Sequence, residues 1–431
     1  MPSSTAPAAI VANLAAEADF ACTLGLRRSA APLSPAARAA AARFGLLLHA
    51  LAADGDVLLL PAAPADVDRA ALADLPGLPA LTADRCVVWP RPGDGGAASD
   101  AAYAPAGGGV LAWAETEAVA ALRAAVAATG AAMGGPLVSD DATAGTAPHT
   151  GDARADALWA LAPPTPLAAA RANHRRVALA AAAGLPGTPP GAAVFDDAGA
   201  LVAHVDALEA TVAAVTGSRR WVVKAACSAA GRDRIWLDAD LLGAATAARV
   251  ARFLHRHGEA VVEPWLDRTA DAGVVGFVDA AGAVHTVGLH RQRVDAHGRF
   301  RGVDVPAAMP APGDDAAIER VLALRPGESA ALRTAHARAG ASLAALGYRG
   351  AFGVDAWRWR GADGVERWHA LGEINARLSI GLVARILVDR VAAAAGPERA
   401  AEIAGRTGVV RVVDAAGVDG GGAALRRPPT D

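Results

Sequence analysis

The sequence uses several residue types sparingly, and these are more informative than the abundant ones. Its high content of Ala, Arg, Gly, Pro and Asp is a bias that high-GC coding produces by itself. Lys and Arg together number 41 among 431 residues, but only Lys224 is a lysine. Asparagine occurs only at Asn13, Asn173 and Asn375, and glutamine only at Gln292. A position that keeps one of these rare side chains is therefore a candidate for a specific chemical role.

Other absences exclude whole classes of protein. The three cysteines, Cys22, Cys86 and Cys227, form neither a C-x-x-C pair nor an even disulfide set, which fits a reducing compartment. Because there is no run of about 18 apolar residues and no basic-then-apolar N-terminal segment, we expect a cytoplasmic protein with no membrane partner. A net charge of -3 without a basic stripe argues against nucleic-acid binding. Small molecules are the expected partners, and a homodimer is left open.

The length predicts two or three domains. Over residues 1–160 the pattern alternates as in an open α/β domain. It predicts a helix over 34–53, a strand at 57–62, a strand candidate at 80–90 and a helix at about 115–129. No G-x-G-x-x-G motif follows a strand there, so a dinucleotide site is not expected.

Beyond residue 160 the pattern becomes α+β. Helices are predicted at about 165–183, 199–216, 238–258 and 328–346. Strands are predicted up to Lys224, at EAVVEPWL, as antiparallel strands over 273–305, and at 351–359 and 366–377. The Gly/Pro-rich tail, residues 418–431, is predicted to be disordered.

Lys224 ends the apolar strand RRWVVKAA and precedes the small-residue segment SAAGR. A lysine in this position can pair with phosphate oxygens while the backbone N–H groups of the following turn approach the same anion. It is not a P-loop lysine, because that motif needs G-x-x-x-x-G before the lysine and Ser or Thr after it. Chance survival of a single lysine is the competing interpretation at this point.

A second cluster lies near the C-terminal end. Glu373 and Asn375 are two residues apart in a predicted strand, so both side chains point to one face, and Asp355 on the preceding strand can share it. Two carboxylates and an amide oxygen make an all-oxygen site of the kind that suits Mg²⁺ held together with substrate phosphates. Arg377 follows on the same face and offers a fork for a phosphate or a developing oxyanion. A solvated polar face on an antiparallel pair is the alternative.

Taken in order, VVKAACSAAGR, VVEPWL, GVDAW and GEINARLSIG resemble the ATP-grasp superfamily in sequence and approximate spacing. The resemblance covers about residues 165–390, and E-I-N-A-R is its most specific part. It implies a pre-ATP-grasp-like domain over 1–160, an ATP-grasp N-lobe over 161–265 and a C-lobe with the metal site over 266–417, before the tail.

The resemblance also implies roles for individual residues. Lys224 matches the strand lysine that holds the α- and β-phosphates, and Arg377 matches the arginine near the transferred phosphoryl and acyl groups. The loop closing over the phosphates corresponds to Ser228, Ala229, Ala230 and Gly231. The hinge whose backbone reads adenine corresponds to Glu263, Pro264, Trp265 and Leu266, with Asp267 or Asp271 near the ribose. The magnesium ligands correspond to Asp355, Glu373 and Asn375.

Two segments leave alternatives. Where the family has a basic residue before the Gly-Leu-Pro bend, this chain has RANHRR, which places Asn173 or His174 near that slot and leaves Arg175 or Arg176 to compensate. On the strand after the hinge, Arg291 and Arg293 share one face while His290 and Gln292 share the other. An arginine facing the cleft suits an anionic substrate or the γ-phosphate, and a solvated edge strand is the competing interpretation. The segment NLAAEAD, residues 13 to 19, has two interpretations: its carboxylates either belong to a helix start or lie at a substrate site.

The expected function is that of an ATP-dependent carboxylate-amine ligase that uses ATP with Mg²⁺, or Mn²⁺ in its place. It activates a small-molecule carboxylate as an acyl phosphate, which an amine or a similar nucleophile then attacks. The alternatives are an ATP-grasp kinase that phosphorylates a small molecule and a non-catalytic nucleotide-binding protein.

Overall fold

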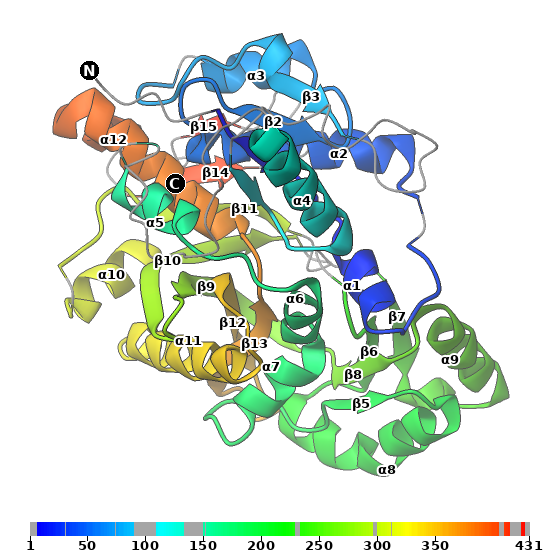
Figure 1. Cartoon of the computed structure of the whole chain (residues 1–431). Helices are drawn as coiled ribbons and strands as arrows, with labels where there is room; N and C mark the ends of the chain where they lie inside the picture. The colour runs from blue at the N-terminus through cyan, green and yellow to red at the C-terminus, as the bar shows by residue number, and fades with distance from the viewer. Residues whose placement is uncertain are drawn as a thin grey trace.

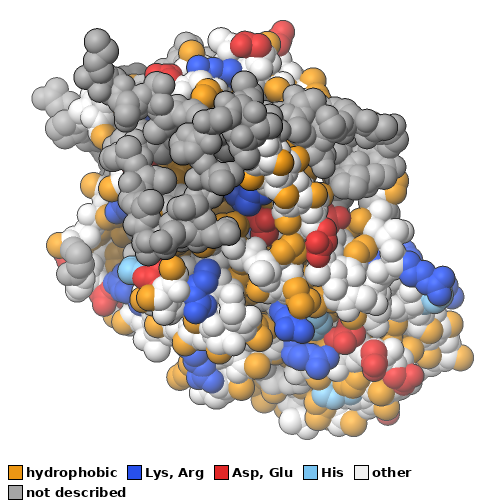
Figure 2. Space-filling view, in the orientation of Figure 1, with side chains coloured by type: hydrophobic (Ala, Val, Ile, Leu, Met, Phe, Trp, Pro, Cys, Tyr) orange, Lys and Arg blue, Asp and Glu red, His pale blue; other side chains and the backbone are white. Residues whose placement is uncertain are grey.

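The computed structural model describes residues 7–30, 32–73, 75–89, 109–132, 150, 152–228, 233–295, 300–311, 313–404, 409–413 and 424–426. The described residues form three sheets with helices around them (Figure 1). This mixed α/β and α+β architecture confirms the predicted fold class. Acidic and basic side chains are interspersed with hydrophobic ones over the face drawn in Figure 2.

The first sheet is parallel and has four short strands in the order β3-β2-β1-β4. These are β1 (Ala9–Val11), β2 (Val57–Leu60), β3 (Cys86–Val88) and β4 (Val110–Ala112). Both faces are buried. Ile10 and Leu58 point into the large central core, while Ala9 and Val11 join a smaller core on the opposite face, as the two-residue period of a strand requires. Apolar runs such as VLLL therefore form strands covered on both sides.

The second sheet is antiparallel, in the order β5-β8-β6-β7. Its strands are β5 (Ala193–Phe195), β6 (Arg220–Ala225), β7 (Arg234–Asp238) and β8 (Ala260–Pro264). It has its own core, formed with helices α8 (Ala198–Thr216) and α9 (Ala244–His257). By length and composition, α8 is the one helix in the described parts of the chain that could cross a membrane. Its apolar residues Leu201, Val205 and Val212 pack in this core.

The third sheet has seven strands in the order β13-β12-β9-β10-β11-β14-β15, all paired antiparallel. They are β9 (Asp267–Val278), β10 (Val284–Val294), β11 (Phe300–Pro306), β12 (Gly350–Arg360), β13 (Glu366–Asn375), β14 (Val409–Val413) and β15 (Ala424–Arg426). Strand β15 lies inside the segment predicted to be a disordered tail, so that prediction does not apply to residues 424–426. The rest of 418–431 is outside the described residues.

The remaining helices connect and cover these sheets (Figure 1). They are α1 (Glu17–Thr23), α2 (Pro35–Gly45), α3 (Asp66–Ala73), α4 (Glu117–Ala132), α5 (Ala153–Trp159), α6 (Pro166–Ala172), α7 (Arg175–Ala182), α10 (Asp315–Leu322), α11 (Glu328–Ala345) and α12 (Ile380–Ala404). Ser34 caps α2 by accepting from the Ala37 N–H, as its Ser-Pro start predicts. The long helix α12 was not identified from the sequence.

Helix α12 packs between the first and third sheets, and its contacts reach the segments around the first sheet. Its residue Arg390 donates to the backbone carbonyls of Ala50 and Ala52 at 2.9 and 2.7 Å, and to that of Gly77 at 3.1 Å. These contacts tie the backbone around the first sheet to the helix that follows E-I-N-A-R.

One predicted helix is two helices. The segment 165–183 forms α6 and α7, which are separated at Asn173 and His174. Asn173 is the C-cap of α6, and the His174 side chain accepts from the Arg176 N–H at the start of α7. Both side chains bond to backbone groups at helix ends. The apolar spacing continues across the break, so helical periodicity did not reveal it.

Candidate functional site

A cavity of about 230 Å³ lies where the three sheets approach one another. Its walls contain ionisable side chains from every part of the fold: Glu17, Lys224, Arg268, Asp355, Glu373 and Arg377. Its other lining residues are Leu14, Phe44, Trp113, Val275, His290, Gln292, Val294, Phe300, Gly353, Trp357, Asn375, Ser379, Ile380 and Gly381. The predicted Lys224 and E-I-N-A-R segments thus face a common space, although about 150 residues separate them.

Asp355 and Glu373 lie directly opposite each other on the antiparallel pair β12 and β13. Opposed residues on such a pair point to the same face and come close together. Burial raises the pKa of Asp355 to about 6, and the Glu373 carboxylate adds to the increase. Two carboxylates confined side by side are a site that gains from a positive ligand.

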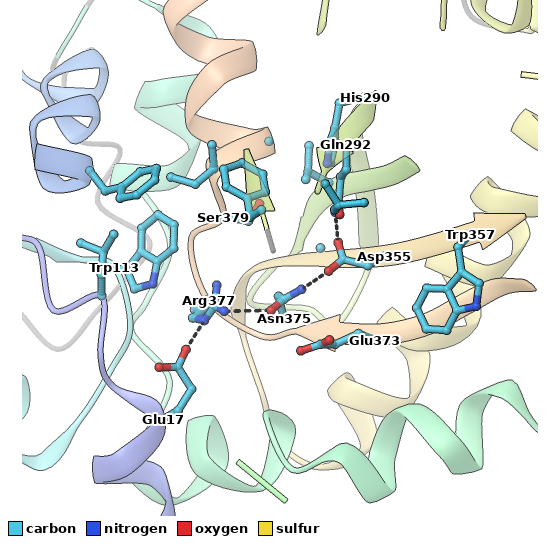
Figure 3. Close-up of a pocket in the computed structure, with 18 of the residues that line it drawn as sticks. Glu17, Trp113, His290, Gln292, Asp355, Trp357, Glu373, Asn375, Arg377 and Ser379 are labelled. Atoms are coloured by element: carbon cyan, nitrogen blue, oxygen red, sulfur yellow. Dashed lines mark hydrogen bonds and ion pairs between the residues drawn. The ribbon is translucent and has the colours of Figure 1, made fainter. Parts of the chain in front are cut away.

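A continuous row of hydrogen bonds crosses the cavity wall (Figure 3). Gln292 donates to Asp355, and the Asn375 amide donates to the other Asp355 oxygen at 3.0 Å. Arg377 donates to the Asn375 amide oxygen at 2.8 Å and to Glu17 at 3.2 Å. The row joins two of the predicted metal ligands, Asp355 and Asn375, to helix α1, so E-I-N-A-R contacts this early segment of the chain directly.

The solitary lysine faces the same cavity and pairs with Glu263 of strand β8. Its side chain is 15% exposed. Burial lowers the pKa of Lys224, and Glu263 offsets this only in part, since the Arg175 cation acts in the opposite sense. An incoming anion would relieve this cost, which agrees with a phosphate-binding lysine.

The residues of the segment RANHRR have different roles. Arg175 reaches Glu373 at 3.1 Å and the Ser228 carbonyl at 3.0 Å, and its cation acts on Lys224. His174 and Arg176 instead bind Glu259 at 3.1 and 2.9 Å. Of the two arginines proposed to compensate for the missing family residue, Arg175 points to the site and Arg176 is largely exposed.

Asn173 has a different function. Its amide oxygen accepts from the Ala376 N–H at 3.0 Å, and its amide nitrogen donates to the Ala376 carbonyl at 2.9 Å. Ala376 lies between Asn375 and Arg377, so this two-point contact fixes the backbone that carries both side chains. Asn173 therefore does not take the place of a nucleotide contact.

The predicted nucleotide hinge lies between two sheets. Strand β8 ends at Pro264 in the second sheet, and β9 begins at Asp267 in the third, with Trp265 and Leu266 between them. Asp271 is buried and paired with Arg268, whereas the side chain of Asp267 is 63% exposed. Ala229, Ala230 and Gly231 lie outside the described residues, and Ser228 is in contact with Arg175.

The arginines of strand β10 face away from the cavity. Arg293 pairs with Asp304 at 2.9 Å, and Arg291 is close to the same group of charges on that side. The face toward the cavity carries His290 and Gln292. Arg291 and Arg293 were predicted to contact the nucleotide, and this prediction needs correction. The two arginines do share one face of strand β10, but the opposite face lines the cavity.

His290 is packed between glycines. A Cβ atom added at Gly381 would lie 2.4 Å from its ring, and one added at Gly273 would lie 2.6 Å away. Burial lowers the pKa of His290 to about 4, so the ring is neutral near pH 7. This is the behaviour of a structural histidine in the cavity wall.

Three cavity residues were missed or left open. Arg268 stacks over Trp357 at 4.3 Å, and burial lowers its pKa to about 10 despite the nearby carboxylates. Glu17 belongs to NLAAEAD, where the sequence could not separate a helix start from a substrate contact. Trp113, whose ring centroid lies 5.3 Å from the Arg377 guanidinium, was not singled out as a site residue.

No protein-family model and no curated protein matches the sequence. Solved structures similar to the chain include a Staphylococcus aureus N5-carboxyaminoimidazole synthetase complexed with ADP, at 13% identity and TM-score 0.32 over 50% of this chain. D-cycloserine synthetase matches at 24% identity and TM-score 0.33 over 53%, covering 73% of its own length. A Campylobacter jejuni biotin carboxylase in complex with an ATP analogue matches at 13% identity and TM-score 0.40 over 90%, covering 70% of its own length.

These proteins are ATP-grasp ligases. The matched region spans only 48% of the S. aureus synthetase. Because the identities and TM-scores are low, the functional assignment depends on the side chains of the cavity.

Proposed function

We propose that this chain is an ATP-dependent ligase of the ATP-grasp type, which activates a small-molecule carboxylate for attack by an amine or a similar nucleophile. The observation that carries the proposal is the meeting of Lys224, the opposed pair Asp355 and Glu373, and Arg377 in one cavity. Lys224 would bind phosphate, Asp355 and Glu373 would bind the metal ion, and Arg377 would bind the acyl group.

At the phosphate end, two cations contribute. Lys224 and Arg175 both lie beside Glu263 and Glu373, and both are largely buried. Their ion pairs keep the charged side chains in place before ATP arrives. Triphosphate oxygens then receive charge-assisted hydrogen bonds from groups that need little reorganisation.

The carboxylate pair fits a magnesium ion. No group of three or more His, Cys, Asp and Glu side chains within the described ranges is arranged to hold a metal. Mg²⁺ in nucleotide sites, however, is usually held by one or two carboxylates together with substrate phosphates. Burial and, after it, the Glu373 carboxylate raise the pKa of Asp355, so a divalent cation bound beside both carboxylates would offset the cost of keeping Asp355 charged.

Asp355 and Glu373 would hold the ion, and Asn375 would add an amide oxygen, which at present accepts from Arg377. A magnesium ion held by these residues would neutralise part of the phosphate charge during phosphoryl transfer. Asn375 has a second task, because its amide orients Asp355 on one side and Arg377 on the other.

Arg377 serves the acyl group. In Figure 3 it lies between Asn375 and Glu17, at the opposite end of the hydrogen-bonded row from Asp355 and Gln292, and there it would bind the substrate carboxylate. After an acyl phosphate forms, its guanidinium stabilises the oxyanion that develops when the nucleophile attacks. The leaving group is phosphate, and no protein nucleophile is required.

Trapping with hydroxylamine tests the reaction without knowledge of the natural amine. An acyl phosphate reacts with hydroxylamine to give a hydroxamate and free phosphate. We expect hydroxamate and ADP only when MgATP, an acid and the enzyme are all present. Lys224→Ala and Glu373→Ala should each abolish this turnover, while Arg176→Ala, an exposed arginine outside the cavity, should retain it. Full activity in both cavity variants would refute the assignment.

A small-molecule kinase is the alternative, because it could use the same phosphate and metal residues. The two reactions differ in their products: a kinase releases ADP and a stable phosphorylated compound, whereas a ligase releases ADP and free phosphate only when acid and nucleophile are both present. A non-catalytic protein would show stabilisation by MgATP without either product.

A further inference from the structure

Part of the cavity wall is apolar. Its residues come from three separate parts of the fold: Leu14, Phe44, Val294, Phe300 and Ile380. Each is only partly buried and lines the cavity. Leu14 and Ile380 lie close along the chain to Glu17 and Arg377, which are hydrogen-bonded to each other. Apolar surface left accessible in a concave site stabilises a ligand that removes it from water.

Two phenylalanines form the centre of this wall. Phe44 ends helix α2 in the N-terminal domain, and Phe300 begins strand β11 of the seven-stranded sheet. Their ring centroids are 6.3 Å apart at an interplanar angle of 54°, which is an ordinary aromatic contact. The wall therefore exists only where the two domains meet.

The polar boundary of this wall is Arg377. Its three described hydrogen bonds use one N–H each from Nε, Nη1 and Nη2, to Glu17, Leu378 and Asn375 respectively. A guanidinium has five N–H donors, so two remain for a ligand. Lys224 and Arg268, the other basic residues that line the cavity, lie at the phosphate end with Trp357 and Glu373.

Building on the proposed function, we propose that the acid substrate has a compact apolar body, and that Phe44 and Phe300 determine this specificity. Arg377 holds the carboxylate, which leaves the rest of the molecule against Leu14, Phe44 and Phe300. An apolar cavity of about 150 Å³ accommodates one benzene ring. The present 230 Å³ includes the space beside the carboxylate pair, so a branched aliphatic or a single-ring acid is the size class that fits.

The probes are 3-methylbutanoate and phenylacetate as apolar acids, and glycolate and succinate as polar acids, each assayed by hydroxamate formation with saturating MgATP. We expect wild-type kcat/KM to favour the apolar pair by about tenfold or more, the scale of discrimination that a hydrophobic pocket achieves. Phe44→Ala should raise the KM for 3-methylbutanoate by about tenfold, because it removes the wall that covers the acid. Val67→Ala, which changes an exposed apolar residue of the same domain, is the matched control.

A second substitution tests the same wall without leaving an empty space that could destabilise the fold. Phe300→Trp fills the cavity instead of enlarging it, so it should reduce turnover of phenylacetate more than that of 3-methylbutanoate. Thermal stabilisation by MgATP is measured for every variant to report on the nucleotide site separately.

The outcomes separate the two proposals. Stabilisation by MgATP with hydroxamate formed from polar acids in preference to apolar ones overturns the apolar subsite and leaves the ligase function intact. Equal loss for all four acids in Phe44→Ala and Phe300→Trp also overturns it. Absence of both MgATP stabilisation and hydroxamate with any acid refutes the ligase function itself.

Discussion

Asp355→Asn should stabilise the unliganded protein above about pH 6 while removing its capacity to hold magnesium. The folded-state pKa of Asp355 is raised to about 6 from an ordinary value of 3.8, first by burial and then by Glu373. The folded state therefore binds this proton more tightly than the unfolded state does. Stability from this group is present at low pH and is lost as the pH rises from about 4 to about 6.

The size of the effect follows from the pKa difference. It corresponds to about 3 kcal/mol in total, of which about 2 kcal/mol is lost between pH 4.5 and pH 7.5. Because Asp355 and Glu373 line a cavity open to solvent, their interaction is screened, and about 1–2 kcal/mol is the expected range. With an unfolding entropy of about 2.1 cal/mol/K per residue, this is about 1–2 °C in Tm if the chain unfolds as one unit.

The assay is thermal unfolding of wild type and Asp355→Asn at both pH values, with and without 10 mM MgCl₂. The variant should gain about 1–2 °C relative to wild type on going from pH 4.5 to pH 7.5, and Mg²⁺ should reduce that gain by stabilising only the wild type. Asp267→Asn makes the same chemical change at an exposed carboxylate and should show neither effect. A Tm difference that does not change with pH would refute the reasoning about the carboxylate pair.

Two further predictions use neighbouring controls. Arg175→Ala should raise the KM for ATP in steady-state kinetics by about tenfold or more, equivalent to about 1.4 kcal/mol or more. Arg176→Ala should leave this KM within about twofold of the wild-type value. Equal effects of the two substitutions would show that Arg175 is not part of the phosphate site. Gly381→Ala should lower Tm and activity, because the new Cβ would lie 2.4 Å from the His290 ring, whereas Gly243→Ala should be tolerated because nothing lies within 4 Å of its Cβ position. An unchanged Tm and unchanged turnover in Gly381→Ala would show that the His290 ring can move aside at little cost.

Much of the fold could be predicted from local patterns. The Ser-Pro start of α2, the apolar strand VLLL, and helices α8 and α11 agree with their sequence signals because caps, period and burial all act within a few residues. The break between α6 and α7 was missed. There the apolar period continues, and the break depends on side-chain contacts that the period does not show: the local cap by His174 and the long-range contact from Asn173 to Ala376.

The candidate site divides in the same way. Rarity and two-residue alternation were enough to select Lys224, Glu373 and Asn375, and the cavity brings them together. The choice between the two faces of strand β10 was wrong for Arg291 and Arg293. A strand pattern defines two faces, but which face is covered depends on the strands and helices packed against it.

The sequence by itself determined the chemistry that is available: a single lysine after an apolar strand, an oxygen-rich strand pair and an arginine two residues beyond. These are local properties, set by residue type and backbone period. The tertiary structure alone decided that Glu17 and Trp113 contact Arg377, that Phe44 meets Phe300, and that Arg175 points inward while Arg176 points to water. Such contacts join residues tens to hundreds of positions apart, and they depend on how the domains pack rather than on any pattern within one segment.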